Sequence, residues 1–396
     1  MRISTNMIYE KGTSAIQQQW QTLTHLGQQV STGRRVLTPA DDPIAAARAL
    51  DLTQSRGINA QFATNQNYAN DNLKLLENKL SGAGDILQYA RERAVQAGNA
   101  TMTPKDLGYI ATDMRAQFEA LLALANTQDA NNEYLFAGYK SQTKPFEGNI
   151  AGISYQGDQG GRTMQVSNSR FMPISLAGTD VFDNTRQLAG SLYNFNNTEN
   201  TGTGSLTLAF NPAQPAAGDT GRRYDITYNG ATYDVVEYQP GGLDAIPVAS
   251  GLTGPTLSFN GLEVNVGGAP AAGDSFEVIV ASKNVFENFA IFIDTLENPG
   301  AGGASSGVAF ALENLDYGIE NVLKVRAQIG SQMVEIEQLQ SVGSDLDLQY
   351  ASTLSRLQDV DYAEAISNLT QQQTYLQAAQ QSFLRITGLS LFNFLQ

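Results

Sequence analysis

The chain has 396 residues, with 24 Lys and Arg against 39 Asp and Glu, one His and no Cys. The absence of cysteine excludes disulfides, thiolate metal sites and a cysteine nucleophile. His25 is the single imidazole, which argues against a His-built zinc site and against a Ser/His/Asp triad. The net charge of −15 argues against a nucleic-acid partner, because such partners are bound by a basic face. We therefore expect no cofactor, no metal and no catalytic residues.

The N-terminal sequence also bears on export. No stretch approaches the ~20 consecutive apolar residues of a membrane-spanning helix, so we expect no membrane insertion. The first residues lack the apolar region of a cleavable secretion signal. A protein without cysteine and without such a signal fits either the cytoplasm or the cell exterior by another export route.

Composition divides the chain into three segments. Nine of the 12 prolines and 21 of the 37 glycines lie between residues 141 and 300, whereas the last 96 residues contain no proline. The same middle segment has 16 acidic and 7 basic residues. Since proline and glycine interrupt helices and punctuate strands, both ends should be helical and the middle rich in β-structure.

The first 30 residues show only a thin apolar stripe, with Ile16, Leu23 and Val30 one heptad apart among many glutamines. A helix of this kind is marginal alone in water. We expect this end to be disordered until a neighbour covers it.

A long second helix is predicted from Pro43 to about Gly98. Asp42 is its candidate N-cap, and Pro43 suits the first helical position. The Asp41-Asp42 pair could instead serve acid–base chemistry or a cation, but helix capping is the favoured interpretation. After a first step of seven residues, the apolar positions repeat every three or four residues, which predicts a coiled-coil-like helix ~80 Å long: Phe62, Ala69, Leu73, Leu76, Leu80, Ala83, Leu87, Ala90 and Ala94. A further helix is predicted to begin at Thr103-Pro104 and to end within Asn126 to Asn132.

The middle segment contains two hairpin signals. Alternating apolar residues flank Asn229-Gly230 and again Asn260-Gly261, and Asn-Gly favours a type I′ turn. Further strands are predicted at 206–210 and 276–280. The sequence Pro-Ala-Ala-Gly-Asp occurs at 215–219 and at 270–274, which indicates either a duplicated unit or turn-rich composition alone.

The C-terminal segment repeats the helical pattern. Apolar residues at helical spacing run from Ile319 to Leu339, a break is predicted around Gly343, and Leu354 and Leu357 follow in the next stretch. The last helix carries Ile366, Leu369, Leu376 and Phe383, with polar residues between them, so this end should also be disordered alone.

The order of segments predicts the architecture. We expect an α+β multidomain fold, in which a long antiparallel helical coiled-coil-like bundle built from both chain ends carries an inserted all-β outer lobe. The predicted divisions are 1–42 with 345–396 as a terminal helical domain, 43–168 with 283–344 as a helical bundle domain with a β-hairpin, and 169–282 as the β-rich outer domain.

Two segments resemble the bacterial flagellin superfamily. Residues 31–43, STGRRVLTPADDP, resemble its N-terminal signature, and residues 354–364, LSRLQDVDYAE, resemble its C-terminal signature. The start MRIST, the segment NEYLFAG at 132–138 with KPF at 144–146, and the end LSLFNFL resemble its hook-associated members. The signature residues are Gly33, Arg34, Pro39, Asp41, Asp42, Pro43, Phe136, Gly138, Pro145, Phe146 and Asp361.

The resemblance implies a non-enzymatic structural protein of the bacterial flagellum, an adapter at the hook–filament junction. It implies export without a cleaved signal peptide to the extracellular flagellum, and a ring of about eleven copies. The implied partners are hook-associated protein 1, flagellin, other copies of the chain and a flagellar export chaperone. The expected assembly and chaperone interface consists of Ile16, Leu23, Val30, Leu354, Leu357, Ile366, Leu369, Leu376 and Phe383. The alternatives are a filament-forming flagellin, and an adhesin or enzyme carried on such a frame by the middle β domain.

Overall fold

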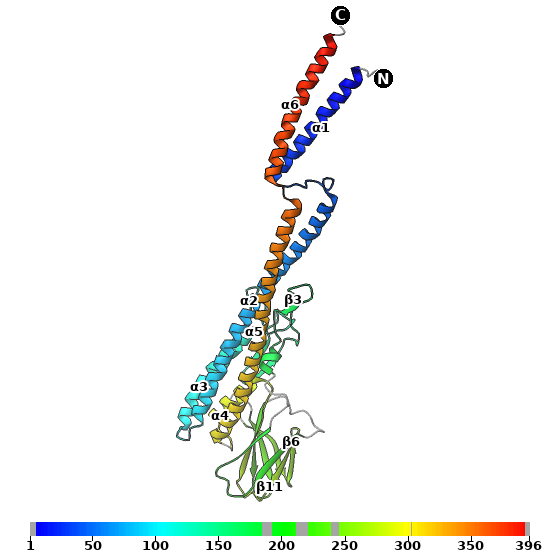
Figure 1. Ribbon diagram of the computed structural model, residues 1–396. Coiled ribbons are helices and arrows are strands. Elements are labelled where there is room, and N and C mark those ends of the chain that lie inside the picture. The colour runs from blue at the N-terminus through cyan, green and yellow to red at the C-terminus, as the bar shows by residue number, and fades with distance from the viewer. Residues whose placement is uncertain (1–4, 184–191, 211–220, 239–244, 302, 393–396) are drawn as a thin grey trace. The chain divides into compact units, whose positions relative to one another are not determined.

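The structure is a computed structural model that describes residues 5–183, 192–210, 221–238, 245–301 and 303–392 (Figure 1). The chain forms two compact units. The terminal unit contains residues 1–64 and 339–396, and the central unit contains residues 65–338.

The terminal unit is helical. Helix α1 (Thr5–Thr32) and helix α6 (Tyr362–Phe392) lie side by side in Figure 1 and pack against each other. The unit also contains the start of α2 (Pro43–Ala97) and the end of α5 (Gly303–Gln358). These two helices are joined by an ion pair of 2.7 Å between Arg56 Nε and Asp347 Oδ1. Both chain ends therefore contribute to one helical unit.

The predicted start of α2 is confirmed. The Asp42 carboxylate accepts a hydrogen bond of 3.0 Å from Ala45 N, and the Asp42 carbonyl accepts one from Ala46 N. Pro43 is the first helical residue. Pro43 has no backbone N–H to lose at this position, so the sequence and the helix start agree.

The central unit contains the remainder of α2 and α5 together with α3 (Pro104–Ala125) and α4 (Val285–Glu297). Thr103 caps α3 in a capping box with Asp106, and Asn126, the first residue of the predicted end, is the C-cap of α3. The apolar stripe predicted for α2 is wholly buried from Ala69 to Ala94. The stripe is thus the face through which α2 packs on its neighbours.

Two small hairpins and one short helix accompany these helices. Strand β1 (Phe146–Asn149) pairs with β2 (Gly152–Tyr155), and β3 (Thr163–Gln165) pairs with β4 (Phe171–Pro173). The π-helix η1 covers Thr179–Asp183. The second hairpin is held to α2 by the Asn65 and Gln66 side-chain amides, which donate to the carbonyls of residues 165 and 166. Arg170 on this hairpin also pairs with Glu335 of α5.

The remaining strands form what we call the β lobe, which is all antiparallel in its described residues. One sheet has the order β5-β12-β7-β8-β9 and the other β10-β11-β6. Their bounds are β5 (Leu192–Asn196), β6 (Ser205–Phe210), β7 (Arg222–Tyr228), β8 (Tyr233–Tyr238), β9 (Ile246–Leu252), β10 (Thr256–Phe259), β11 (Leu262–Gly267) and β12 (Ser275–Val280). Apolar residues of both sheets, among them Leu257 and Val264 from one and Ile226 and Val278 from the other, form one buried core. The lobe is therefore a two-layer sandwich.

One of the two predicted type I′ turns is correct. Asn260 and Gly261 have φ of +44° and +76°, and Phe259 pairs with Leu262 across a two-residue turn. The prediction at Asn229-Gly230 is wrong, because Tyr228 pairs with Tyr233 and leaves a four-residue loop. There the Asn229 side chain accepts hydrogen bonds from the N–H groups of residues 231 and 232, and this Asx turn replaces the tight one.

The predicted helix break around Gly343 is also wrong, since α5 is continuous from Gly303 to Gln358. The Asn59 amide on α2 donates a hydrogen bond of 2.8 Å to the Gly343 carbonyl. A single glycine costs a helix only ~1 kcal/mol, and packing along a long neighbouring helix outweighs that cost. Of the two Pro-Ala-Ala-Gly-Asp sequences, the one at 215–219 lies outside the described residues.

Candidate assembly interface

The two signature segments of the terminal unit bind each other, although more than 300 positions separate them. Arg34 and Asp359 form an isolated antiparallel bridge. Arg35 N donates to the Gln358 carbonyl at 2.6 Å, and Val360 N donates to the Gly33 carbonyl at 2.9 Å. The segment between α1 and α2 is thus paired with the segment between α5 and α6.

The geometry at Gly33 and Arg35 explains why the first signature segment has a glycine and an arginine at these two positions. Gly33 has φ of +71°, and a Cβ added to it would lie 2.8 Å from the Tyr362 hydroxyl. Glycine alone meets both demands without strain. The Arg35 guanidinium donates from Nη2 to the Leu357 carbonyl at 2.9 Å and to the Asp42 carboxylate at 3.3 Å.

Asp41 organises the turn that precedes α2. Its Oδ2 accepts hydrogen bonds from Leu37 N at 2.9 Å and from Thr38 N at 2.7 Å. The Asp41 N–H donates to the Thr38 carbonyl and closes a turn, in which Pro39 occupies the second position. The hydrogen bond from the Thr38 N–H holds the pKa of Asp41 below its usual value. His25 Nε2 lies 3.0 Å from Asp41 Oδ1, so the single histidine joins this turn to α1.

Asp361 has the matching role at the start of α6. Its carboxylate accepts hydrogen bonds from Ala363 N at 2.9 Å and Glu364 N at 3.3 Å, and its carbonyl accepts one from Ala365 N. Each of the two signature segments therefore supplies an aspartate cap for the helix that follows it.

The structure places the apolar residues of the predicted interface at several depths in the terminal unit. Leu376 is buried and Ile366 is exposed, and the others are half-buried: Ile16, Leu23, Val30, Leu354, Leu357, Leu369 and Phe383. The Phe383 ring packs on the Tyr9 ring with centroids 5.1 Å apart, and a Cβ on Gly12 would lie 2.5 Å from the Phe383 ring. Phe383 is thus used for packing between α1 and α6 within one chain.

A second set of apolar residues on the terminal unit faces outward. These large side chains are each 46–70% exposed: Met7, Tyr9, Trp20, Ile44, Leu50, Ile58, Val342, Leu348, Tyr362, Ile366, Tyr375, Leu384 and Ile386. We call this set the exposed apolar set. Apart from Ile366, the heptad pattern of the sequence did not select these residues. They can be found by searching for large apolar residues that lie off the apolar stripe of each predicted helix.

The third signature segment has a different role, in the central unit. Phe136 and Phe146 both pack against Phe182, with ring centroids 5.5 and 5.4 Å apart, and Phe146 also contacts Phe286 at 5.1 Å. Pro145 beside them is buried as well. Gly138 has φ of +68°, and a Cβ there would clash with the Asp158 carboxylate. These residues build the core between the first hairpin and α4.

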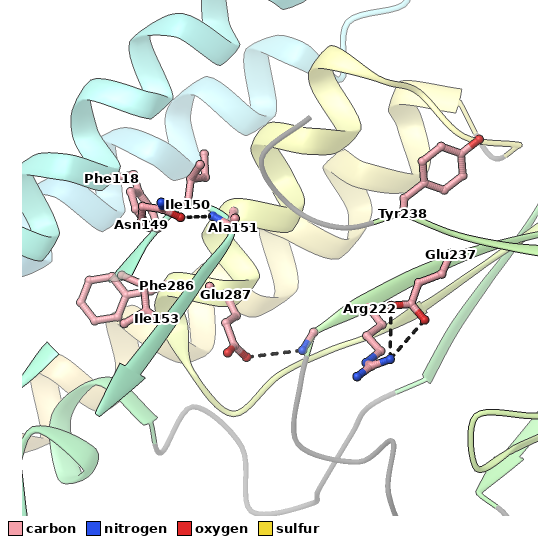
Figure 2. Close-up of a pocket in the computed structure, with 13 residues that line it drawn as sticks. Phe118, Asn149, Ile150, Ala151, Ile153, Arg222, Glu237, Tyr238, Phe286 and Glu287 are labelled. Atoms are coloured by element: carbon pink, nitrogen blue, oxygen red, sulfur yellow. Dashed lines mark hydrogen bonds and ion pairs between the residues drawn. The ribbon is translucent and has the colours of Figure 1, made fainter. Parts of the chain in front are cut away.

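The central unit also holds a cavity of about 210 Å³ between α3, the first hairpin, β7, β8 and α4. Figure 2 shows that Phe118, Ile153 and Phe286 line one side of it, and that Arg222 and Glu237 meet on the other. The Arg222 guanidinium and the Glu237 carboxylate form an ion pair of 3.1 Å, and Glu287 accepts from Gly221 N at 3.4 Å. Arg222 and Glu237 are thus paired with each other, and Glu287 is bound by a backbone N–H.

The described residues contain no group of three or more His, Cys, Asp or Glu side chains placed to hold a metal ion. Within the same ranges, no helix is long and apolar enough to cross a membrane.

Family models match most of the chain in three pieces. Residues 3–141 match the bacterial flagellin N-terminal helical region, and residues 312–395 match the flagellin C-terminal helical region. Residues 195–280, which include most of the β lobe, match the D2-like domain of flagellar hook-associated protein 1. Flagellin itself matches less of the chain: that of Listeria monocytogenes is 25% identical over 133 residues, 33% of this chain.

Two curated relatives extend over the whole chain. Flagellar hook-associated protein 3 of Salmonella typhimurium is 31% identical over 398 residues, and that of Escherichia coli is 30% identical over the same length, each covering 99% of both chains. The crystal structure of FlgL from Xanthomonas campestris matches with a TM-score of 0.54 and 26% identity, covering 77% of this chain and 99% of that one. Hook-associated protein 3 from Legionella pneumophila matches with a TM-score of 0.53 and 27% identity, covering 77% and 98%. The chain therefore belongs to the flagellar hook-associated protein 3 family, FlgL.

Proposed function

We propose that this chain is a structural adapter of the bacterial flagellum that joins the hook to the filament. The observation that carries the proposal is the full-length match to flagellar hook-associated protein 3, with flagellin-type helical regions at both ends of the chain. The flagellin of Listeria monocytogenes matches only a third of the chain, whereas hook-associated protein 3 matches 99% of it, which favours a junction protein over a filament subunit.

The proposed partners lie along the axis of the flagellum. Hook-associated protein 1 would contact one side of a layer built from about eleven copies of this chain, and flagellin would polymerise on the other. The similarity of residues 195–280 to a domain of hook-associated protein 1 supports a shared architecture with that neighbour.

We further propose a three-part organisation. Residues 1–42 with 345–396 would form the terminal helical domain, residues 43–168 with 283–344 a coiled-coil-like bundle domain, and residues 169–282 the outer domain. The apolar stripe of α2, buried from Ala69 to Ala94, supports the bundle, and the sandwich core supports the outer domain.

The terminal unit is the proposed assembly surface. Its exposed apolar set would be covered by neighbouring copies and axial partners once the ring forms, and before export a chaperone would cover the α6 part of the set and the half-buried stripe beside it. Export would proceed to the cell exterior without cleavage of a signal peptide. The protein would act without catalysis, because its relatives are structural components of the flagellum.

Deletion of the gene tests this function. Cells should keep their hooks, lack attached filaments and shed flagellin into the medium, and a plasmid copy should restore filaments. Normal filaments in the deletion strain would contradict the proposal. The number of copies of this chain per flagellum distinguishes the proposed adapter from the flagellin alternative, since a filament subunit would be recovered in large excess over any junction protein.

A further inference from the structure

Arg223 is a charged residue buried where the β lobe meets the helices. It lies on β7 with 1% of its side chain exposed. Its Nη2 is 2.8 Å from Asp294 Oδ2 on α4, and its Nη1 donates to the Asn298 carbonyl at 2.6 Å. The guanidinium also lies over the Tyr238 ring, 4.3 Å from the centroid. A buried cation needs such partners, because burial without them is strongly unfavourable.

Two more carboxylates bind the same part of the helical layer. Glu277 on β12 is wholly buried, lies 3.6 Å from Arg223, and accepts a hydrogen bond of 2.6 Å from the Ser306 hydroxyl on α5. Asp225 on β7 accepts from Ala301 N at 3.2 Å. Together, Arg223, Asp225, Glu277 and Asp294 form what we call the Arg223 cluster. It joins β7 and β12 to the end of α4, to the α4–α5 turn at residues 298–301 and to the start of α5.

The cluster has more carboxylates than cations. Among the neighbouring elements, α3 contributes Arg115, which is already paired with Glu297 of α4 at 2.5 Å. On the adjacent strands, Arg222 is paired with Glu237, and Tyr238 contributes a phenol. Among the described residues, the buried carboxylates of Glu277 and Asp294 and the half-buried carboxylate of Asp225 thus face one buried guanidinium, that of Arg223, while Arg115 acts on Asp294 only as a neighbouring charge.

This imbalance makes the contact dependent on protons. Burial raises the pKa of Asp294 and of Asp225 above the usual value, while the charge of Arg223 opposes the shift in both. A carboxyl with a raised pKa binds its proton more tightly in the closed contact than in an opened one, where its pKa returns towards 3.8. Acid therefore favours the closed contact, and the preference is lost as pH rises through the raised pKa.

We propose that the Arg223 cluster is a proton-dependent latch, which holds the β lobe on the α4–α5 turn and loosens as the pH rises. Apolar contacts of Ile279 and Phe310 with α4 and the neighbouring strand hold the same interface. When the latch loosens, the α4–α5 turn therefore opens first, while these apolar contacts keep the β lobe attached to the helices.

Hydrogen exchange of the full chain between pH 4 and pH 8 tests the latch. The measured quantity is the opening equilibrium constant of the turn amides, above all Ala301 N–H, after correction for the intrinsic exchange rate. The constant should rise with pH, by up to tenfold per unit for one proton. Asp294→Asn and Asp225→Asn should each flatten this rise. Asp316→Asn, which removes an exposed ion pair with Arg91, is the matched control and should leave the rise unchanged.

Gly300→Ala provides a test that removes no charge. Its added Cβ would lie 2.9 Å from Asp225 Oδ1 and 3.0 Å from Glu277, so it should displace the turn and speed exchange there at every pH, with the β-sandwich core still protected. A wild-type opening constant that is flat or falls as pH rises would overturn the proposal. So would an unchanged rise in both asparagine variants, or an unchanged turn in Gly300→Ala.

Discussion

Asp183 at the end of η1 carries a carboxyl group whose ionisation should weaken the central unit. Its Oδ1 is buried and has no hydrogen-bond partner among the described residues. Burial, reinforced by repulsion from Glu287 and opposed by Lys283, raises the pKa of Asp183 to about 7. The group is therefore largely protonated in the folded protein at pH 5 and largely ionised at pH 8.

The sign and size of the effect follow from linkage. Because the folded pKa lies above the usual value of 3.8, the folded state binds the proton more tightly than the unfolded state. Stability from this group is fully present below the unfolded pKa and is lost as the pH rises through about 7. A shift of about 3 units at 1.36 kcal/mol each corresponds to ~4 kcal/mol in all, of which ~2.6 kcal/mol falls between pH 5 and pH 8.

Asp183→Asn should remove this dependence. The free energy of opening at the neighbouring buried residues Val181 and Phe182, measured by hydrogen exchange at pH 5, 6, 7 and 8, should decrease with pH by ~2.6 kcal/mol more in the wild type than in the variant. Asp180→Asn is the control, because Asp180 is an exposed carboxylate of the same short helix. Equal pH dependence in the wild type and Asp183→Asn would refute the reasoning.

Three further predictions concern the signature residues and the exposed apolar set. Gly138→Ala should destabilise the central unit by at least ~1–3 kcal/mol in thermal unfolding, because its backbone φ is positive and the new Cβ would strike Asp158, whereas the exposed Gly152→Ala should change little. Asp42→Ala should cost about 1 kcal/mol through loss of the α2 cap, measured as faster amide exchange at residues 44–46; exchange equal to that of the control Asp51→Ala would show that the cap adds nothing. Leu384→Asp, at a side chain 70% exposed, should leave the isolated chain folded by circular dichroism but reduce the fraction of cells with filaments, while Ile246→Asp on β9 should not. Full filament numbers in Leu384→Asp cells would remove α6 from the proposed assembly surface.

The sequence alone predicts the helices well because their signals are local. Asp42-Pro43 and Thr103-Pro104 mark helix starts through groups that lie within a few residues of each other, and the structure confirms both. The buried face of α2 follows in the same way from a regular repeat. The predicted break at Gly343, which the structure does not contain, shows the limit of such local signals. The Asn59 side chain on another helix contacts this glycine, and that contact cannot be read from the residues around Gly343.

The candidate sites depend on contacts that a single sequence does not display. Arg35 reaches the Leu357 carbonyl across 322 positions, and Arg223 meets Asp294 only because a strand and a helix are packed together. Likewise, a helical repeat identifies an apolar stripe but not whether the same chain or a partner covers it. Leu376 is buried within the chain, whereas Leu384, which the repeat did not select, is exposed.

The prediction that both chain ends are disordered alone remains for experiment. In the structure, residues 5–32 and 362–392 are helical and pack together. Their outward-facing apolar side chains would gain most of their burial from neighbours, so amides of α1 and α6 should exchange rapidly in a dilute monomer and slowly in an assembled ring. Strong protection in the monomer would contradict this expectation.

Electron cryo-microscopy of the native hook–filament joint tests the central claim most directly. We predict a layer of this chain between hook-associated protein 1 and flagellin, with the α1 and α6 residues of the exposed apolar set covered by adjacent copies or by those partners. A joint without this chain, or its presence along the filament instead, would contradict the proposed function.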